Sequence, residues 1–190
     1  MSYDVIEYWR NRLKTVGTIN SVKLEDETID PIEERLIRKY IPEMSLIMDY
    51  GVGGGRLFPL YDDMNFYVVG CDIADFTDII KFKCPYLRYE HFIFDSSIKT
   101  VFANDSFEYI VSFMVLLHQT HDNISKVIAE LYRVCSDTCI ISSWEPVVKP
   151  VAPETYCFAH DYEKLYTEAG FTIVESVRAD DRIKFYVLKK

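Results

Sequence analysis

The sequence lacks the long apolar runs that membrane proteins need. No uninterrupted run approaches the roughly 20 apolar residues of a membrane-spanning helix, so we expect no transmembrane segment. A secretory signal is also missing, because the first 20 residues carry Asp4, Glu7, Arg10 and Arg12 in place of an apolar core. The five cysteines are odd in number and lie mostly inside apolar runs, as reduced core cysteines do. These features predict a soluble, cytoplasmic protein.

Basic clusters and metal-ligand spacings are scarce as well. The formal net charge is −9, and no run of Lys or Arg is longer than Lys189–Lys190, so the mean field repels polyphosphates. We therefore expect a small molecule or a peptide as the partner rather than long nucleic acid. Cys135 and Cys139 have no second cysteine or histidine pair at zinc spacing, so no metal site is predicted.

What the sequence does contain is a regular alternation of short apolar runs and helical stretches. Its 190 residues, 49% of them hydrophobic, are enough for one buried core. The alternation is typical of parallel βαβ units. The predicted strands are Leu46–Tyr50, Phe66–Asp72, Tyr89–Phe94, Phe107–Phe113, Thr138–Ser143, Phe171–Val177 and Ile183–Leu188.

Helical stretches separate most of these strands. Residues 178–182, between the last two strands, are too few for a helical crossover and predict an antiparallel hairpin. An amphipathic N-terminal stretch and a helix over Pro31–Tyr40 precede the first strand. We therefore divide the chain into an N-terminal helical extension, residues 1–42, and a main domain, residues 43–190. The helices predicted within the main domain are Gly54–Met64, Phe76–Phe82, Ile124–Val134 and Asp161–Ala169.

The sharpest motif follows the first strand and reads Asp49-Tyr-Gly-Val-Gly-Gly-Gly-Arg56. Glycines at the carboxyl end of a parallel strand let a ligand approach the backbone closely. A dinucleotide fingerprint would need Gly or Ala where Arg56 stands, and a Walker loop would need Gly-Lys followed by Ser or Thr. A glycine turn without a ligand is the remaining alternative.

The pattern Asp-x-Gly-x-Gly-x-Gly resembles motif I of the class I S-adenosylmethionine-dependent methyltransferases. Further landmarks of that family recur in order, at Gly70–Ile73, at Phe94–Ser97 and at Ser106–His118, so that the resemblance spans Leu46 to about Ser143. It implies a three-layer α/β sandwich with a seven-stranded, mostly parallel sheet of order 3-2-1-4-5-7-6 and an antiparallel last strand. It also implies methyl transfer from S-adenosylmethionine, with S-adenosylhomocysteine as the product.

The resemblance assigns the cofactor site to the ends of the first four strands. Asp72 ends the second strand, where a carboxylate accepts both hydroxyls of a ribose. A plain turn or helix cap is the competing explanation for Asp72, Asp95 and Ser96. The residues implied are Asp49 at the methionine end, Gly51, Gly53 and Gly55 around the turn, Asp72 at the ribose, Ile73, Asp95 and Ser96 at the adenine, and Phe113 at the cofactor edge.

Methyl transfer is an in-line displacement, so the enzyme mainly aligns the acceptor, and a base helps if the acceptor is a hydroxyl or a protonated amine. His118, in the turn after the fourth strand, is the predicted base. The predicted acceptor contacts are His121, Trp144 at the end of the fifth strand, and Trp9 and Arg12 in the N-terminal stretch. Ordinary packing of the tryptophans and a surface position for the histidines are the alternatives.

Two segments without a place in the core remain, residues 1–30 and the proline-rich residues 145–159. A long irregular segment in a compact domain is often functional, so we predict that both roof the acceptor pocket. A non-catalytic scaffold or regulatory subunit is the alternative function, since a fold alone does not prove activity. A nucleic-acid methyltransferase is a further one, although its Asn/Asp-Pro-Pro-Tyr/Phe signature is replaced here by Ser112-Phe-Met-Val.

Overall fold

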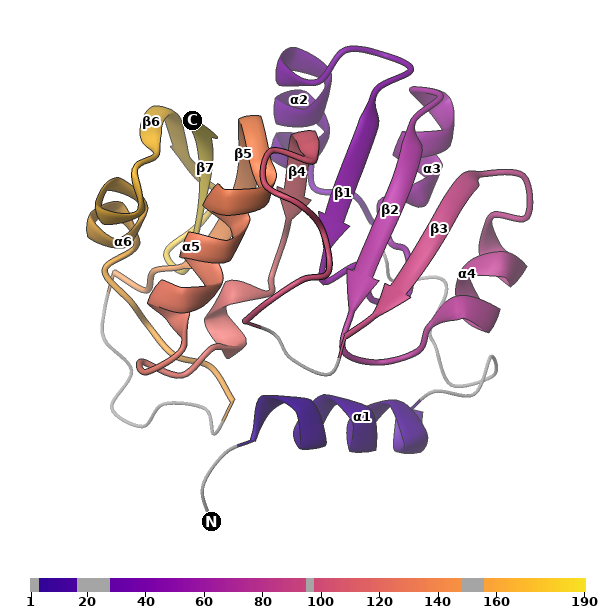
Figure 1. Ribbon diagram of the computed structural model, residues 1–190, viewed down its shortest axis with the longest axis horizontal. Coiled ribbons are helices and arrows are strands. Elements are labelled where there is room, and N and C mark those ends of the chain that lie inside the picture. Colours follow the sequence, from indigo (N-terminus) through magenta and orange to yellow (C-terminus); the bar gives the residue numbers. More distant parts are fainter. Residues whose placement is uncertain (1–3, 17–27, 95–97, 148–155) are drawn as a thin grey trace.

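In the described part of the chain, α1 and α2 precede the sheet (Figure 1). The computed structural model describes residues 4–16, 28–94, 98–147 and 156–190, and the side chains of these except 12–16 and 83. The first helix is α1, Val5–Val16, and the second is α2, Pro31–Tyr40, with the predicted bounds. A capping box fixes the start of α2, because the Asp30 side chain accepts from the backbone of Ile32 while the Glu33 side chain accepts from the backbone of Asp30.

Seven strands form one sheet of order β3-β2-β1-β4-β5-β7-β6, which confirms the predicted fold. Strands β1 to β5 pair in parallel, whereas β7 runs antiparallel to both β5 and β6. The strands are β1 Leu46–Tyr50, β2 Tyr67–Asp72, β3 Arg88–Ile93, β4 Phe107–Ser112, β5 Cys135–Trp144, β6 Thr172–Arg178 and β7 Ile183–Lys189.

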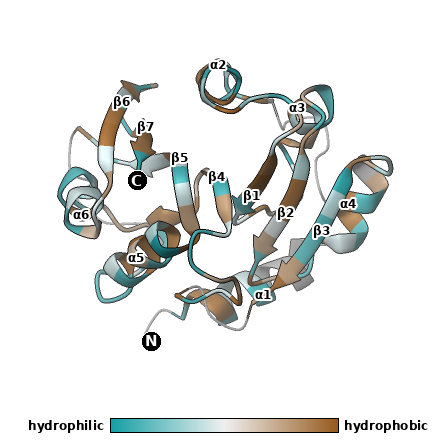
Figure 2. Ribbon diagram, turned by 45° about the horizontal axis from the view of Figure 1, so that its top comes forward, coloured by the Kyte–Doolittle hydropathy of each residue, from teal (hydrophilic) through white to brown (hydrophobic). Residues whose placement is uncertain are grey.

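Helices cover both faces of this sheet and make three layers (Figure 2). Side chains alternate along a strand, so neighbouring residues of β1 enter different cores. Ile47 packs in a core with residues of α2, α3 and α4, and Met48 packs in a core with residues of α5 and α6. The remaining helices are α3 Phe58–Asp63, α4 Thr77–Lys83, the 3-10 turn η1 Leu116–His118, α5 Ile124–Val134 and α6 Tyr162–Ala169.

Two predicted elements have different bounds in the structure. Helix α3 begins at Phe58 and not at Gly54, because Gly53 and Gly55 have φ values of 51° and 74°, which a right-handed helix does not contain. Strand β5 begins at Cys135 and not at Thr138, because the chain passes from the end of α5 directly into an extended conformation. The other elements agree to within a residue or two at their ends.

The carboxyl ends of β1, β2, β3 and β4 meet at one edge of the sheet. The order 3-2-1-4 reverses direction between β1 and β4, and ligands bind outside such a switch point in open α/β sheets. Helix α1 lies across this edge, beneath the arrowheads in Figure 1. Within the described ranges, no helix is long and apolar enough to cross a bilayer.

Candidate active site

A cavity of about 150 Å³ lies between α1 and the carboxyl edge of the sheet. The strand ends, α1 and the turn after β4 all contribute to its wall. Its lining comprises Val5, Trp9, Tyr50, Gly51, Gly53, Cys71, Asp72, Ile73, Phe76, Phe94, Met114, Val115, His118 and Gln119.

Two glycines of the loop after β1 face different surroundings. Gly51 has φ 82°, and a Cβ there would lie 2.2 Å from a methyl carbon of Val115, so the chain packs too tightly for a side chain. Gly53 has φ 51° and lines the cavity, and a Cβ there would meet no atom within 4 Å. The space above Gly53 is therefore open for a ligand that passes close to the backbone.

Asp72 lies next to this glycine loop and lines the cavity. Its two carboxylate oxygens accept from the backbone nitrogens of Gly53, at 2.9 Å, and Ala74, at 3.0 Å. Burial raises the pKa of this carboxyl, and the backbone hydrogen bonds oppose that rise. Helix α4 has Phe76 as its N-cap, so Asp72 is not a helix cap. Each carboxylate oxygen has more than one lone pair, which leaves capacity for ribose hydroxyls.

Asp49 lies behind the loop and not among the residues that line the cavity. It is 5% exposed, and its carboxylate accepts from the Tyr61 hydroxyl at 3.0 Å. Burial raises the pKa of Asp49 to about 7, against the opposing effects of the Tyr61 hydrogen bond and the Arg56 charge. Arg56, which excluded a dinucleotide fingerprint, binds both carboxylate oxygens of Glu33 at 2.6 and 2.7 Å and so ties the loop to α2. Gly55 also lies off the cavity, against Phe58.

On the side of the cavity where the adenine is predicted to bind, some of the lining residues were not predicted from the sequence. Ile73 lines the cavity, together with Phe76 and Phe94. Asp95 and Ser96 lie outside the described residues. Their predicted contacts with the adenine stay predictions.

The end of β4 presents Met114 to the cavity instead of Phe113. Phe113 is 8% exposed and packs against the ring of Phe185, with 5.6 Å between ring centroids. Met114 has φ 59°, and its backbone nitrogen donates to the Ser142 hydroxyl at 2.8 Å. Because neighbouring residues point in different directions at a strand end, a shift of one position separates the cavity residue from the core residue.

His118 lines the cavity from the turn η1. Its Nδ1 lies 2.8 Å from the carbonyl oxygen of Tyr156, and since a carbonyl only accepts, Nδ1 carries the proton of this hydrogen bond. In the neutral ring the lone pair then lies on Nε2. Trp9 packs edge-on against the same ring, with 4.6 Å between centroids. The structure thus brings the predicted base and one predicted acceptor contact together.

His121 and Trp144, two other predicted acceptor contacts, do not line the cavity. His121 is exposed, and its Nδ1 lies 3.2 Å from Nδ1 of His160, whose Nε2 donates to the Gln119 carbonyl. Burial lowers the pKa of His160 to about 4. Trp144 is half-buried and pairs with Ile183 in the sheet. The side chain of Arg12 lies outside the described part of the chain.

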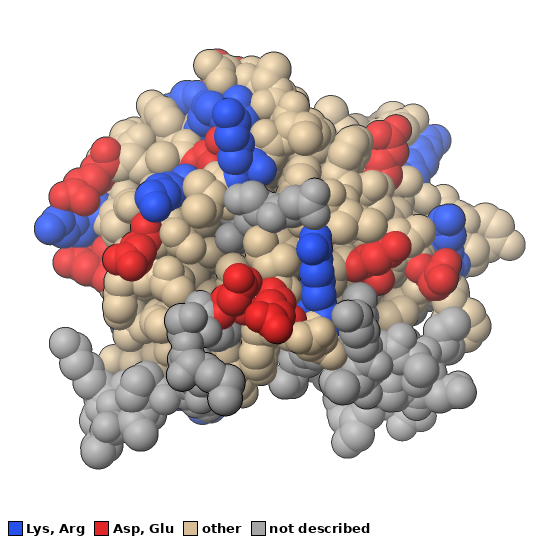
Figure 3. Space-filling view, turned by 60° about the horizontal axis from the view of Figure 1, so that its bottom comes forward, with Lys and Arg blue, Asp and Glu red and all other residues tan. Residues whose placement is uncertain are grey.

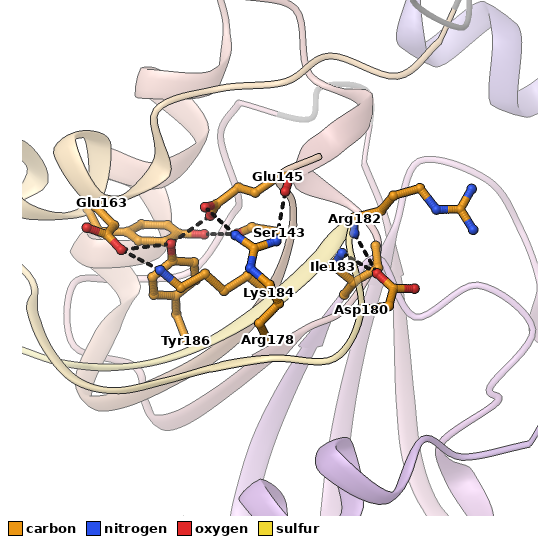
Figure 4. A network of polar contacts seen from close by, with 10 residues as sticks. Ser143, Glu145, Glu163, Arg178, Asp180, Arg182, Ile183, Lys184 and Tyr186 are labelled. Atoms are coloured by element: carbon orange, nitrogen blue, oxygen red, sulfur yellow. Dashed lines mark hydrogen bonds and ion pairs between the residues drawn. The ribbon is translucent and has the colours of Figure 1, made fainter. Parts of the chain in front are cut away.

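A polar network occupies the end of β5 beside Trp144 (Figure 4). The Tyr186 hydroxyl donates to Glu145 at 2.7 Å, and Arg178 donates to the Glu145 carbonyl at 2.9 Å. Lys184 forms an ion pair with Glu163 of α6. These contacts tie the end of β5 to β6, β7 and α6, so this end of the sheet is a structural corner and not part of the cavity wall.

Several lining residues were missed from the sequence. Phe94 directly follows the end of β3 and Met114 lies two residues after the end of β4, positions that could have identified them. Val5 and Gln119 carried no such signal, since only the packing of α1 and η1 brings them to the cavity.

Charges of both signs are scattered over the face that carries α1 (Figure 3). On the described part of this face, no continuous basic area is visible. A polyphosphate backbone would need such an area to bind along it.

Comparisons with known proteins agree with this geometry. Residues 48–141 match the family model described as a methyltransferase domain. A comparison with curated proteins found no match.

Solved structures resemble most or all of the chain at low sequence identity. The 1,6-didemethyltoxoflavin-N1-methyltransferase of Burkholderia thailandensis is 17% identical, with a TM-score of 0.78, over 100% of this chain and 92% of that chain. The magnesium protoporphyrin IX methyltransferase of Synechocystis PCC 6803 with bound S-adenosylmethionine is 15% identical, with a TM-score of 0.73, over 100% and 98%. The [4+2]-cyclase SpnF is 11% identical, with a TM-score of 0.69, over 83% and 79%. At this identity, the likeness concerns the fold.

Proposed function

We propose that this chain, a member of the class I S-adenosylmethionine-dependent methyltransferases, methylates a small-molecule acceptor and uses His118 as the base. The family-model match and the likeness to solved methyltransferase structures confirm the family resemblance seen in the sequence, the enzyme class and the cofactor. The acceptor class and the roles of individual residues are the proposal. The observation that carries it is one cavity that joins the glycine loop, Asp72 and His118.

The described residues fit the cofactor. The open space at Gly53 admits a ligand along the loop, and Asp72 offers a carboxylate inside the same cavity. We assign the ribose to Asp72, the adenine to the side of Ile73, Phe76 and Phe94, and the methionine end to the loop at Gly51 and Gly53. When bound, S-adenosylmethionine supplies an electrophilic methyl group.

Residues of this chain then position the acceptor and remove its proton. His118 accepts a proton at Nε2 from the acceptor O–H or N–H, while the Tyr156 carbonyl holds the ring through Nδ1. Trp9 covers His118 and excludes water from the reacting groups. Asp49 supports the loop from behind rather than binding the cofactor directly.

A small molecule fits the acceptor role better than a polymer. The cavity has a volume of about 150 Å³ and lies beneath α1, and the described face around α1 has no continuous basic area. The toxoflavin and protoporphyrin enzymes named above act on small molecules, which supports the same class here. Five cysteines without a disulfide support a cytoplasmic location.

Two measurements test this function. Calorimetry with S-adenosylhomocysteine measures the cofactor site, and transfer of a labelled methyl group into fractionated cell extract measures the acceptor class. We expect binding, and label in the low-molecular-mass fraction. Label in the RNA or protein fraction would overturn the acceptor class. Binding without any transfer would indicate a scaffold, and no binding would overturn the function itself.

A further inference from the structure

Arg10 joins α1 to the ends of two neighbouring strands. Its Nε donates to the carbonyl oxygen of Ile73 at 2.9 Å, and its Nη2 donates to that of Phe94 at 3.2 Å. Ile73 follows β2 and Phe94 follows β3. A planar guanidinium is suited to bridge two such acceptors because its donors point in fixed directions.

The two carbonyls belong to residues that line the cavity. Phe94 also donates its backbone N–H to the Asp72 carbonyl at 2.8 Å, so the two strand ends stay paired up to the point where Arg10 binds them. In the proposed function this wall holds the adenosine part of the cofactor. The Arg10 side chain therefore binds backbone carbonyls of the cofactor wall and leaves the side chains of Ile73 and Phe94 to line the cavity.

The same helix closes the cavity with other residues. Val5 and Trp9 are four residues apart, lie on one face of α1 and both line the cavity. Trp9 packs on His118, and Tyr8 stacks on Tyr156 with 5.1 Å between centroids. Helix α1 is thus held against the turn after β4 by aromatic contacts and against β2 and β3 by Arg10.

We propose that Arg10 is a positioning residue that keeps α1 closed over the adenosine part of the bound cofactor and slows its release. The proposal rests on the proposed function, because it assumes that the cofactor occupies this cavity. The cofactor and its product pass α1 in every cycle, so the two hydrogen bonds of Arg10 break when the helix opens. Their loss lowers the barrier to opening and leaves the strand ends intact.

The dissociation rate of S-adenosylhomocysteine tests this directly. In Arg10→Ala we expect release roughly 10-fold to 100-fold faster, as for the loss of charged hydrogen bonds, with a much smaller change in the association rate. Arg10→Lys keeps the charge but cannot bridge both carbonyls, so we expect it to restore little. 5′-Methylthioadenosine carries the adenosine part without the amino-acid part. Its dissociation rate should differ between wild type and Arg10→Ala by the same factor. The melting temperature of the ligand-free protein should stay unchanged.

Two control variants separate this role from general stability. Asp4→Ala removes the side chain that accepts from the backbone of Ile6 and Glu7 at the start of α1, while Arg10 is kept. Arg35→Ala removes an exposed guanidinium that pairs with Glu175 and does not line the cavity. We expect wild-type release in Arg35→Ala and a smaller change in Asp4→Ala than in Arg10→Ala.

Each other result overturns the inference in a distinguishable way. Wild-type release rates in Arg10→Ala, or full rescue by Arg10→Lys, would show that bridging of the carbonyls does not hold the helix. An equal effect in Asp4→Ala would assign the result to the stability of α1. If wild-type protein itself binds neither ligand, the proposed function fails along with the inference.

Discussion

The two halves of the cavity are built in different ways. The strand-end half comprises Tyr50, Gly51, Gly53, Cys71, Asp72, Ile73, Phe76 and Phe94, which follow or end β1, β2 and β3. The roof half comprises Val5, Trp9, Met114, Val115, His118 and Gln119, which come from α1 and from the turn after β4. Parallel pairing places the first set at one edge, together with Met114 and Val115 after β4, whereas Val5 and Trp9 join them only when α1 packs across the sheet. We therefore expect the strand-end half to supply the cofactor contacts, and the roof half to govern turnover and the rate of cofactor release.

The strongest test of the strand-end half is Gly53→Val. The branched side chain would enter the open space of the cavity, so we expect no measurable binding of S-adenosylhomocysteine. The positive φ of Gly53 adds strain of about 1 to 2 kcal/mol, which a stable domain tolerates. Calorimetry measures the binding and circular dichroism the fold.

Gly51→Ala is the matched contrast, because its Cβ would lie 2.2 Å from Val115. We expect this variant to lose stability first. Unfolding of Gly53→Val, or tight binding by it, would remove the distinction between the two glycines.

Asp72→Ala tests the same half through charge. The carboxylate would lose two charge-assisted hydrogen bonds to the ribose, each of about 1.5 to 3 kcal/mol, so the Kd for S-adenosylhomocysteine should rise roughly 100-fold or more. Part of this rise reflects the loop, since Asp72 also holds the backbone of Gly53. Asp72→Asn keeps an acceptor for one such bond, so its Kd should lie between those of wild type and Asp72→Ala. An unchanged Kd in Asp72→Ala would contradict the assignment.

His118→Ala tests the roof half. Loss of a general base typically slows turnover by about 100-fold or more, while the affinity for S-adenosylhomocysteine should change little. His121→Ala is the control, because His121 is exposed and lies off the cavity. Labelled methyl transfer to the acceptor fraction measures both variants. Equal losses in the two variants would remove His118 from the mechanism.

Removal of residues 1–21 tests the roof as a unit. The truncated protein would lack Val5, Trp9 and Arg10, so we expect turnover to fall by roughly 10-fold or more, with a smaller loss of stability. Hydrogen exchange in α1 should slow when S-adenosylhomocysteine is added to the full chain. A truncated protein that unfolds would show that α1 is core packing and not a lid.

The smallest expected effect is on the pH dependence of stability, through Asp49 behind the glycine loop. Its pKa is raised from 3.8 to about 7, so ionisation costs the folded state more than the unfolded state. The stability that the protonated form contributes is present below pH 4 and is lost as the pH rises to about 7. In Asp49→Asn this loss disappears while an acceptor for Tyr61 remains. Between pH 5 and pH 8, the free energy of unfolding of the variant should therefore rise relative to that of wild type by roughly 1 kcal/mol or more, as measured by thermal unfolding.

The helices and strands could be predicted from the sequence because their signals are local, since apolar runs, glycines and helix caps act within a few residues. The order of the strands in the sheet was implied by the family resemblance, and with β1 and β2 paired in parallel it brings Gly51, Gly53 and Asp72 together. Two details differ from the expectation. The left-handed glycines delay the start of α3, and Met114 lines the cavity at the end of β4 while Phe113 packs against Phe185. The predicted contact of Phe113 with the cofactor stays a prediction.

The sequence by itself determined the order of strands and helices along the chain, since periodicity and turn chemistry depend on neighbouring residues. The motifs at Asp49–Gly55 and at the later strand ends carried the resemblance that implied the family and the cofactor. Only the tertiary structure decided that Arg10, and not a residue of the glycine loop, joins α1 to β2 and β3. It also decided that His118 lies under Trp9 while His121 faces solvent. These arrangements depend on contacts between segments 63 to more than 100 residues apart, which no local pattern encodes.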